Sequence, residues 1–505
     1  MRASLGVDWS LRKVQSVRGI EDHLPDLQLR IDRPAGGLAA QVAAELRSAI
    51  RSGRLAGGAR LPASRELARD LGTSRGVVVE AYEQLVAEGF LVSRQGSDTR
   101  VADLQPAPAD GAASPAAPPP PPVAYDLRVG TPDLSAFPRR AWLAAMRQVM
   151  KALPHQALGY GDPAGVPQLR AELAAYLRRV RAADADADRL VVTNGVAQGL
   201  HLVIGALARA GPLPLAVEDP HSVRTLELLE DAGAVRVPVP VDGEGIVVEE
   251  LRRSPARAVM VTPAHQYPTG VVLSPRRRAE LVAWATEADG VVLEDDYDAE
   301  FRYDRDPVGC LQALCPQRVV LLGSVSKALA PGLRLGWLVA PPALAAAVRA
   351  ARATSDLGSP VLDQYTLAEL LASGAYDRQL RQLRRRYRAR RDALTGALAR
   401  WLPGAVVHGV SAGIQLYVEL PAGHDEAAVV AAAAERGVAV DGVAPLRIAG
   451  GGPPALVLGF ARLPEHRIAD AVRLLAEAAR RSRHRPARRS TTGAKASMSP
   501  SATTR

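Results

Sequence analysis

Residues 291–297 read VVLEDDY, and residues 319–327 read VVLLGSVSK. Each stretch begins as a short apolar run, which is typical of a buried strand, and each ends in charged or hydroxyl side chains. In an open α/β sheet, ligand-binding groups lie beyond the carboxyl ends of the strands. The two stretches therefore predict an α/β domain whose binding site contains Asp295 and Lys327.

The residue types around Lys327 suit one cofactor. Ser324 and Ser326 precede the lysine, and Arg334 follows seven residues later. Pyridoxal 5′-phosphate needs an amine that forms a Schiff base, an acid that keeps the pyridinium nitrogen protonated, and an arginine with hydroxyls for the phosphate. Asp295 or Lys327 alone would be an ordinary polar residue. Their ordered combination predicts a site for pyridoxal 5′-phosphate.

Other motifs extend this pattern over residues 124–479, where buried-strand runs alternate with helical patterns. They are YGDPAG at 160–165, TNGVAQ at 193–198, TPAHQYPTG at 262–270 and EDDYDAEF at 294–301. With them, the region from about Tyr125 to Ala478 resembles the fold-type I, class I aminotransferases. That resemblance implies an α/β domain with a large mixed sheet and a small C-terminal subdomain. The third and fourth motifs are similar to those of the MocR/GabR subfamily of GntR regulators.

The resemblance also implies roles for single residues. Lys327 would form the aldimine with the cofactor, Asp295 would pair with its pyridinium nitrogen, and Tyr297 would hydrogen-bond its phenolic oxygen. Tyr160 would reach the phosphate in the neighbouring subunit of a homodimer, because sites of this fold are shared across a dimer. The resemblance further implies that the cofactor, chiefly its phosphate, is held by Ser324, Ser326, Arg334, Gly195, Val196 and His265.

Two departures from the aminotransferase pattern concern the ligand. The family usually has an aromatic residue stacked on the cofactor ring, but residues 218–222 read EDPHS. Ser222 cannot stack, so either His221 or another residue covers the ring, or the affinity for the cofactor falls. A late strand usually supplies an arginine for the substrate carboxylate, but residues 456–460 read LVLGF. Because a guanidinium is the favoured receptor for a carboxylate, Arg224 is the best substitute and Arg447 a weaker one.

The N-terminal region, residues 36–102, predicts a second, smaller domain. Apolar residues recur with helical spacing over Leu38–Arg51, Ser64 is placed to cap a short helix, and Thr73 or Ser74 is placed to cap a third helix that ends near Gly89. Residues 90–101 predict two short strands around a glycine-containing tip. This order is typical of an α+β winged helix-turn-helix.

The same region resembles the GntR-type winged-helix domain over its whole length. The matching residues include LP at 61–62, SR at 64–65, LA at 67–68, SR at 74–75 and EGF at 88–90. An exposed arginine at the start of a helix adds charge where the helix dipole already favours phosphate. The resemblance implies that double-stranded operator DNA is contacted by Arg65, Ser74, Arg75, Gln95 and Gly96. Unlike many relatives, this chain has GVVV at 76–79 after the second Ser-Arg pair.

The remaining segments separate or flank these domains. Residues 103–123 are rich in alanine and proline, which predicts a stiff polyproline linker, and residues 1–35 form an N-terminal extension without a clear pattern. Residues 480–505 hold eight Lys and Arg and no acid, so most of the formal charge of +10 lies in a tail that we expect to be disordered.

Composition narrows the class of protein further. The two cysteines, Cys310 and Cys315, cannot build a disulfide framework, and no His/Cys cluster has zinc spacing, so no metal site is predicted. We find no signal peptide and no apolar run long enough to span a membrane, which predicts a cytoplasmic protein without a membrane partner.

Two functions remain open at this point. The first is a transcriptional regulator whose aminotransferase-like domain senses an amino compound, through an external aldimine, or senses pyridoxal 5′-phosphate itself. The second is an active aminotransferase with an accessory DNA-binding domain. The intact Lys327 and Asp295 permit transamination, whereas the missing late arginine and ring-stacking aromatic favour the regulator.

Overall fold

The structure is a computed structural model that describes residues 27, 29–93, 98–103, 123–303 and 308–482. The chain divides into two compact units, Met1–Pro119 and Pro120–Arg505, which are described separately. The predicted linker between residues 103 and 123, the wing tip with Gln95 and Gly96, and residues 483–505 of the predicted basic tail lie outside the described residues. The prediction that the tail begins at residue 480 is wrong, because Arg480 and Arg481 form the end of a helix, α14 (Glu465–Arg481). Among the residues that are described, no helix has the length and apolar character to cross a membrane.

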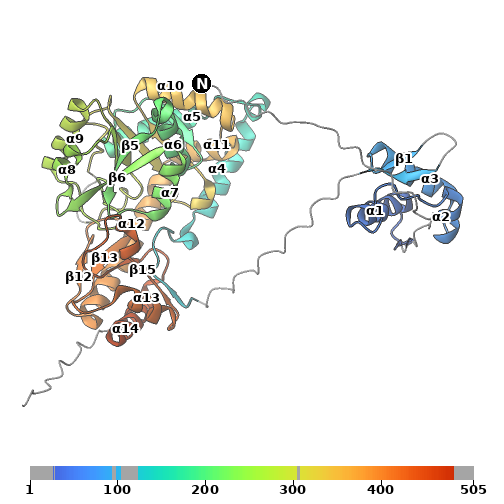
Figure 1. Ribbon diagram of the computed structural model, residues 1–505. Coiled ribbons are helices and arrows are strands. Elements are labelled where there is room, and N and C mark those ends of the chain that lie inside the picture. Colours follow the sequence, from blue (N-terminus) through green and yellow to red (C-terminus); the bar gives the residue numbers. More distant parts are fainter. Residues whose placement is uncertain (1–26, 28, 94–97, 104–122, 304–307, 483–505) are drawn as a thin grey trace, which may run out of the picture. The chain divides into compact units, whose positions relative to one another are not determined.

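The first unit contains a helix-turn-helix followed by a two-stranded wing (Figure 1). Its elements are α1 (Leu38–Arg51), α2 (Ser64–Asp70), α3 (Arg75–Ala87), β1 (Leu91–Ser93) and β2 (Thr99–Val101). The wing strands pair antiparallel, with Leu91 opposite Val101. The helices pack because each turns an apolar stripe inward, and Val42, Leu46, Val78 and Leu85 are fully buried between them.

One predicted cap in this unit is wrong. Ser64 is the first residue of α2 rather than its cap, and Ala63 precedes the helix. The side chain of Glu66 accepts a hydrogen bond from the amide of Ala63 at 3.2 Å, so it satisfies an amide at the helix start. The hydroxyl of Ser64 instead accepts a hydrogen bond from Nε of Arg75 at 3.3 Å. Ser74 does precede α3, although its side chain makes no capping hydrogen bond.

The segment before α1 packs on this unit, although its sequence shows no pattern. Leu27, Leu29 and Ile31 lie against the apolar core. Arg33 donates a hydrogen bond to the carbonyl oxygen of Leu71 at 2.7 Å, at the turn between α2 and α3. The segment therefore braces the helix-turn-helix from outside.

The second unit is built on an eight-stranded sheet. The order is β4 (Leu190–Thr193), β11 (Gly336–Val339), β10 (Val319–Ser324), β9 (Val291–Asp295), β8 (Ala258–Val261), β5 (Leu213–Asp219), β6 (Ala234–Asp242) and β7 (Gly245–Ile246). The strands from β10 to β6 run parallel, while β11 is antiparallel to both β10 and β4, and β7 is antiparallel to β6. The predicted mixed sheet is confirmed.

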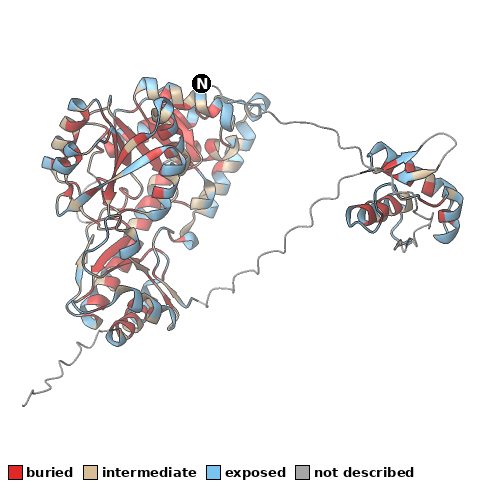
Figure 2. Cartoon of the chain, in the orientation of Figure 1, coloured by how far each residue is buried: buried red, intermediate tan, exposed pale blue. Residues whose placement is uncertain are grey.

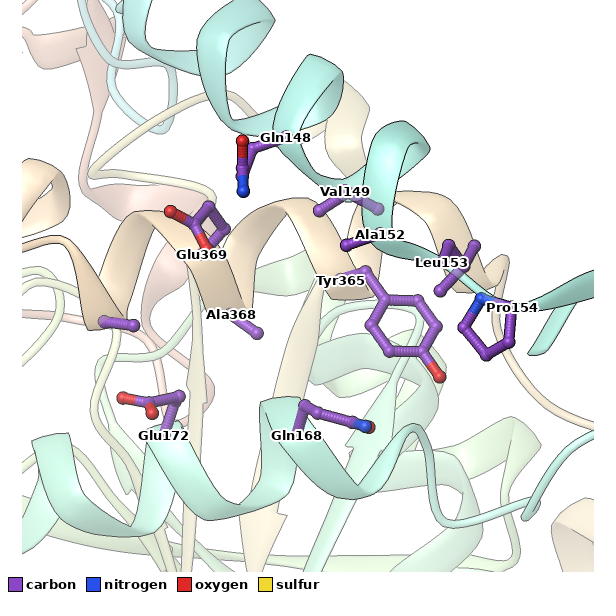
Figure 3. A pocket seen from close by; sticks show the side chains of 11 residues that line it. Gln148, Val149, Ala152, Leu153, Pro154, Gln168, Glu172, Tyr365, Ala368 and Glu369 are labelled. Atoms are coloured by element: carbon purple, nitrogen blue, oxygen red, sulfur yellow. The ribbon is translucent and has the colours of Figure 1, made fainter.

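Helices cover both faces of the sheet, which explains why its strands are apolar on both sides (Figure 2). One face packs against α6 (Val196–Leu207), α7 (Val223–Asp231) and α10 (Pro342–Ser355). The other face packs at the β5–β9 end against α8 (Val248–Arg253) and α9 (Pro275–Glu287). At the β4–β11 end it packs against α5 (Pro167–Arg181), α11 (Val361–Ala372) and α12 (Ala375–Trp401). Figure 3 shows α11 between α5 and α4 (Arg139–Ala152).

The C-terminal subdomain has its own four-stranded antiparallel sheet. Its order is β12 (Val406–His408), β13 (Gln415–Glu419), β16 (Ala455–Gly459) and β15 (Asp441–Gly442), and α13 (Glu426–Ala434) and α14 (Glu465–Arg481) belong to the same part (Figure 1). A separate short pair joins β14 (Val438–Ala439) to β3 (Tyr125–Asp126). The start of the second unit is thereby tied to its end.

Candidate functional site

The predicted site residues gather at one edge of the large sheet. Strands β5, β8, β9 and β10 are parallel and β4 runs in the same direction, so their carboxyl ends share this edge. The strand β9 ends at Asp295, β10 ends at Ser324, and β4 ends just before Asn194. An edge of this kind is where α/β sheets place ligand-binding groups.

Lys327 lies three residues beyond the end of β10 and is half-buried. Its Nζ donates a hydrogen bond to the carbonyl oxygen of Gly130 at 2.5 Å. Burial lowers the pKa of the Lys327 amine, and the nearby carboxyls of Asp298 and Asp295 oppose that shift. An amine with a lowered pKa is more often neutral, which is the form that attacks a carbonyl carbon.

Asp295 offers an oxygen that nothing in the described chain satisfies. Its Oδ1 is buried and has no hydrogen-bond partner. Burial and the neighbouring Asp296 raise the pKa of the Asp295 carboxyl to about 7, although the Lys327 amine opposes the shift. A buried carboxyl oxygen without a partner is costly, so a ligand with a positively charged N–H group fits this position.

Two side chains from different parts of the fold hydrogen-bond the hydroxyl of Tyr297, and a third side chain, Asp298, contacts one of them. Nδ1 of His265 lies 3.1 Å from the Tyr297 hydroxyl oxygen and 3.1 Å from Oδ2 of Asp298. Gln415, the first residue of β13, donates from Nε2 to the same hydroxyl at 2.9 Å. The structure therefore brings Tyr297 and His265 into contact and adds Asp298 and Gln415, two residues that sequence reasoning missed. Asp298 lies inside a quoted motif, but no local signal points to Gln415.

The turn after β4 has the form of a phosphate-binding turn. Gly195 has a φ of +83°, and a Cβ there would lie 2.9 Å from Nη2 of Arg334. Arg334 is exposed and donates to the carbonyl oxygen of Asn194 at 2.6 Å, so its other N–H groups remain available. Val196 begins α6, whose free amides face the same turn. Ser324 is buried and Ser326 half-buried, and the amide of Ser326 donates to Oγ of Ser324 at 3.3 Å.

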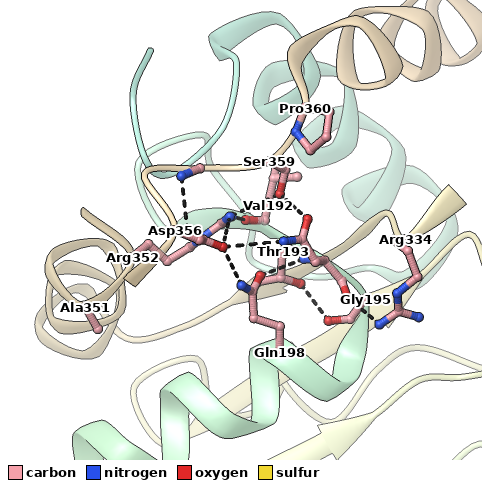
Figure 4. Close-up of polar contacts among 12 residues, drawn as sticks. Val192, Thr193, Gly195, Gln198, Arg334, Ala351, Arg352, Asp356, Ser359 and Pro360 are labelled. Carbon is pink, nitrogen blue, oxygen red and sulfur yellow. Dashed lines mark hydrogen bonds and ion pairs between the residues drawn. The ribbon is translucent and has the colours of Figure 1, made fainter. Parts of the chain in front are cut away.

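A polar network fixes this turn from behind (Figure 4). Gln198 accepts a hydrogen bond from the amide of Asn194 at 2.7 Å and donates to Oδ2 of Asp356 at 2.5 Å. Arg352, which is fully buried, donates to both carboxylate oxygens of Asp356. Ser359 donates to the Asn194 side chain at 2.7 Å. The position of Asn194 and of the glycine after it is therefore set by three elements, not by the turn alone.

His221 and Ser222 lie where the family usually has an aromatic residue stacked on the cofactor ring. Ser222 precedes α7 and accepts a hydrogen bond from the amide of Thr225 at 3.4 Å. His221 is buried, and neither of its ring nitrogens has a partner within the described chain. Burial lowers the pKa of His221 to about 4, with Asp219 opposing the shift. His221 is thus a neutral ring with unsatisfied polar atoms, and it lies two residues beyond the end of β5.

The two arginines considered for a ligand carboxylate differ in surroundings. Arg224 is exposed on the first turn of α7. Arg447 already donates to the hydroxyl of Tyr417 at 3.1 Å and to the carbonyl oxygen of Pro453 at 2.5 Å. In β16, Val457 pairs with Tyr417 on one side and with Asp441 on the other. The residues of β16 itself read ALVLG, so this late strand contributes no cationic side chain.

In the first unit, Arg65, Ser74 and Arg75 are all exposed at the starts of α2 and α3. The hydrogen bond from Arg75 to Ser64 ties the two helix starts together. Another arginine, Arg33, contacts the turn between the two helices. This surface therefore gathers cationic side chains where a duplex phosphate would be bound.

Tyr160 does not reach the site of its own chain. It is 94% exposed, in the segment that follows a short 3₁₀ helix at His155–Leu158. A tyrosine so exposed contributes little to its own fold and is available to another molecule.

Comparison with known proteins assigns both units of the chain to families. Residues 125–475 match the family described as aminotransferase class I and II, and residues 38–101 match the bacterial regulatory proteins of the gntR family. Over 424 residues the chain is 34% identical to the HTH-type pyridoxine biosynthesis transcriptional regulator PdxR of Corynebacterium glutamicum, covering 83% of this chain and 91% of that one. It is 32% identical over 423 residues to the probable rhizopine catabolism regulatory protein MocR of Rhizobium meliloti, covering 79% and 85%.

Solved structures match the second unit. The α-aminoadipate aminotransferase LysN of Thermus thermophilus, complexed with N-(5′-phosphopyridoxyl)-L-leucine, is 29% identical and superimposes with a TM-score of 0.64 over 70% of this chain and 92% of that one. The kynurenine aminotransferase of Pyrococcus horikoshii is 28% identical, with a TM-score of 0.65 over 70% and 90%. This chain belongs to the MocR-type subfamily of GntR transcriptional regulators, in which a winged helix-turn-helix domain precedes a domain of the aminotransferase class I and II family.

Proposed function

We propose that this regulator binds pyridoxal 5′-phosphate covalently through Lys327 and uses the loaded domain to sense an amino compound or the cofactor itself. The observation that carries the proposal is the buried Oδ1 of Asp295, which has no partner among the described residues. The carboxyl of Asp295 also interacts electrostatically with the Lys327 amine. When bound, the cofactor supplies an aldehyde carbon that reacts with amines and a ring that withdraws electrons from the product. The residues present fit that group.

Each part of the cofactor has a matching set of residues. Oδ1 of Asp295 would accept the pyridinium proton, and the Tyr297 hydroxyl would bind the phenolic oxygen. Arg334, with the amides at the start of α6 and the hydroxyls of Ser324 and Ser326, would hold the phosphate. His221 would cover one ring face in place of the absent aromatic, because it is a neutral aromatic ring at the end of β5.

A homodimer would complete this site. On α4 and in the segment after it, three apolar side chains are more than half exposed, namely Leu143, Met150 and Leu158, and Tyr160 lies beside them in sequence. A groove between α4, α5 and α11 is lined by Leu153, Tyr365 and Ala368 (Figure 3). Because exposed apolar side chains of this size favour contact with another protein, we assign this region to the subunit interface. A second copy seated here would bring its own Tyr160 to the phosphate.

The first unit would bind double-stranded operator DNA. Arg65, Ser74 and Arg75 would contact the duplex from the starts of α2 and α3, and Gln95 and Gly96, which lie outside the described residues, would enter the minor groove from the wing. Two copies of this unit would reach two half-sites through the linkers. Any switch requires that the effector bind the two arrangements of the dimer with different affinity.

The effector class depends on Arg224. If Arg224 turns towards the site, it would bind a carboxylate, since its guanidinium has no described partner and residues 456–460 contain no arginine. If it does not, the cofactor alone is the better effector, because little else would recognise an amino acid. The names of two relatives, which refer to pyridoxine biosynthesis and to rhizopine catabolism, are compatible with either class.

The test uses the purified full chain. Incubation with pyridoxal 5′-phosphate should produce a visible absorption band, and borohydride reduction should label the peptide that contains Lys327. Gel-shift binding to the chain's own upstream DNA, with and without the cofactor, should differ. A Lys327→Ala variant that keeps the full effector response on DNA would overturn covalent sensing. Fast transamination of an amino-donor panel without DNA binding would instead favour an enzyme.

A further inference from the structure

The C-terminal subdomain reaches the cofactor site through one side chain. Gln415 is 2% exposed, and its backbone pairs with Gly459 at the end of β16, which fixes the direction of its side chain. Its Nε2 donates to the Tyr297 hydroxyl at 2.9 Å, across 118 residues of sequence. Tyr297 therefore takes one of its hydrogen bonds from a subdomain other than its own.

The second hydrogen bond to Tyr297 comes from a buried histidine–aspartate pair. The His265 and Asp298 side chains are 0% and 1% exposed. A carboxyl oxygen accepts hydrogen bonds, so the tautomer of His265 that satisfies Oδ2 of Asp298 is the one that carries a proton on Nδ1. The same N–H lies 3.1 Å from the Tyr297 oxygen and is shared with it.

These two donors determine where the Tyr297 proton can go. A phenolic oxygen accepts up to two hydrogen bonds and donates one. Nε2 of Gln415 and Nδ1 of His265 fill the acceptor positions, and among the described residues no acceptor is bonded to the hydroxyl proton. We propose that Gln415 is a positioning residue that forces Tyr297 to donate its proton to the cofactor's phenolic oxygen. The inference deepens the proposed function and rests on it.

The direction of this proton affects the cofactor's chemistry. A donor at the phenolic oxygen stabilises its negative charge, and that charge is greatest when the adjacent nitrogen, through which Lys327 holds the cofactor, has lost its proton. The hydrogen bond therefore lowers the pKa of that nitrogen. Gln415 thus sets the protonation of the loaded site without touching the cofactor.

Glycines bring the subdomain close enough for this contact. A Cβ on Gly413 would lie 2.1 Å from Cε1 of His265 and 2.6 Å from Oδ2 of Asp298. A Cβ on Gly270 would lie 2.4 Å from Cα of Gly409, so the two loops cross backbone to backbone. The loop that leads into β13 is therefore packed directly on the histidine–aspartate pair.

Other charged groups near Tyr297 remain the same in the proposed test. The titratable groups that act on Tyr297 from its own segment and from neighbouring elements are Asp295, Asp298, His265 and Tyr267. None of these is altered by a change at position 415.

The test exchanges donor and acceptor in the hydrogen bond between Gln415 and Tyr297. In Gln415→Glu, an isosteric carboxylate accepts the Tyr297 proton and turns it away from the cofactor. The measurement is the pH midpoint of the visible absorption of the cofactor-loaded full chain. We expect Gln415→Glu to raise this midpoint by about one pH unit, the scale of one charge-assisted hydrogen bond. Gln379→Glu, a buried glutamine that donates to the carbonyl oxygen of Ala136, should leave the midpoint unchanged.

A second background separates the proton's direction from the added charge. In Tyr297→Phe there is no hydroxyl proton to redirect, so Gln415→Glu should add no further shift, whereas a direct charge effect would persist and would overturn the inference. Where the glutamate variant does not fold, Gln415→Met removes the donor without a charge and should raise the midpoint by less. A wild-type midpoint in both Gln415 variants also overturns the inference. If the wild-type chain shows no visible band after incubation with the cofactor, the proposed function itself is contradicted.

Discussion

Arg181 holds Asp296 through two hydrogen bonds, from Nε to Oδ2 at 2.7 Å and from Nη2 to Oδ1 at 2.9 Å. Both side chains are buried, at 3% and 8% exposure. Asp296 follows Asp295 directly, so this pair neutralises one acid of the strand end and leaves the other free of a guanidinium. The free acid is the one that we assign to the cofactor.

Removing Arg181 should therefore destabilise the second unit. Arg181→Met leaves Asp296 unpaired among the buried carboxyls of Glu294 and Glu300, and burial already raises the pKa of each of these to about 7. Breaking a buried pair in this way costs about 3–5 kcal/mol in the free energy of unfolding. Arg179→Met, which breaks the exposed pair with Asp377, should cost less than about 1 kcal/mol. Urea denaturation of both variants measures the two losses in the free energy of unfolding. Equal losses would contradict the conclusion that the buried pair of Arg181 and Asp296 stabilises the second unit.

Asp295 gives the cofactor-free chain a pH dependence of defined sign. Its folded pKa of about 7 lies above the value of about 4 expected in an unfolded chain. Between these values the unfolded chain binds fewer protons, so the contribution of Asp295 to stability falls as pH rises from about 4 to 7. Asp295→Asn should be more stable than wild type at pH 8 by about 1–3 kcal/mol without cofactor, and equal to it near pH 4. It should also retain the cofactor poorly.

Urea titrations at the two pH values check this. Asp470→Asn, on the exposed face of α14, is the control and should show no comparable gain. A loss of stability at pH 8 in Asp295→Asn would mean that the carboxyl has a partner in the folded chain.

His221 should make the stability of the chain depend on pH with the opposite sign. Its folded pKa of about 4 lies below the usual value of about 6.5, so the unfolded chain binds the extra proton as pH falls from about 6.5 to 4 and stability is lost. His221→Phe cannot be protonated, so between pH 7 and pH 5 it should lose about 1–2 kcal/mol less than wild type. His466→Phe, at an exposed position of α14, should not change the slope. Matching slopes in wild type and His221→Phe would show that the ring is protonated in the folded chain.

Much of this site follows from sequence alone, because the end of a buried strand is a local feature. The apolar runs before Asp295 and Lys327 predict both strand ends, and the structure places them at one sheet edge. Gln415 could not be predicted, because its contact with Tyr297 joins residues 118 positions apart and follows no local pattern. The prediction that Ser64 caps α2 is wrong. It rests on the residue type, which favours a cap, whereas in the structure the Ser64 hydroxyl accepts a hydrogen bond from Arg75 instead.

Arg75 should account for part of the DNA affinity. It is exposed at the start of α3 and has one described contact, with Ser64. If it binds a phosphate, Arg75→Ala should weaken binding and reduce the salt dependence of the affinity by about one counterion. Fluorescence anisotropy on a duplex from the chain's upstream region, over a series of salt concentrations, gives both quantities. Arg209→Ala, an exposed arginine of the second unit, is the control. An unchanged salt slope in Arg75→Ala would remove this residue from the DNA surface.

Gly413 offers a test of how tightly the C-terminal subdomain is packed on the cofactor site. Gly413 and Gly423 have similar backbone conformations, with φ values of +76° and +85°, so alanine strains the backbone at either position. At Gly423 nothing lies within 4 Å of the added Cβ, whereas at Gly413 it meets His265 at 2.1 Å. Gly423→Ala should therefore cost about 1 kcal/mol, from backbone strain alone.

Gly413→Ala should cost about 2–3 kcal/mol more, because His265 and Asp298 must move to admit the methyl group. That movement also carries Nδ1 of His265 away from Tyr297, so the visible absorption of the loaded chain should titrate at a higher pH than in Gly423→Ala. Denaturation of the cofactor-free chain and pH titration of the loaded chain measure the two effects independently. Equal stability losses in the two variants would show that the loop relaxes freely, and the subdomain would then have no rigid contact with the site.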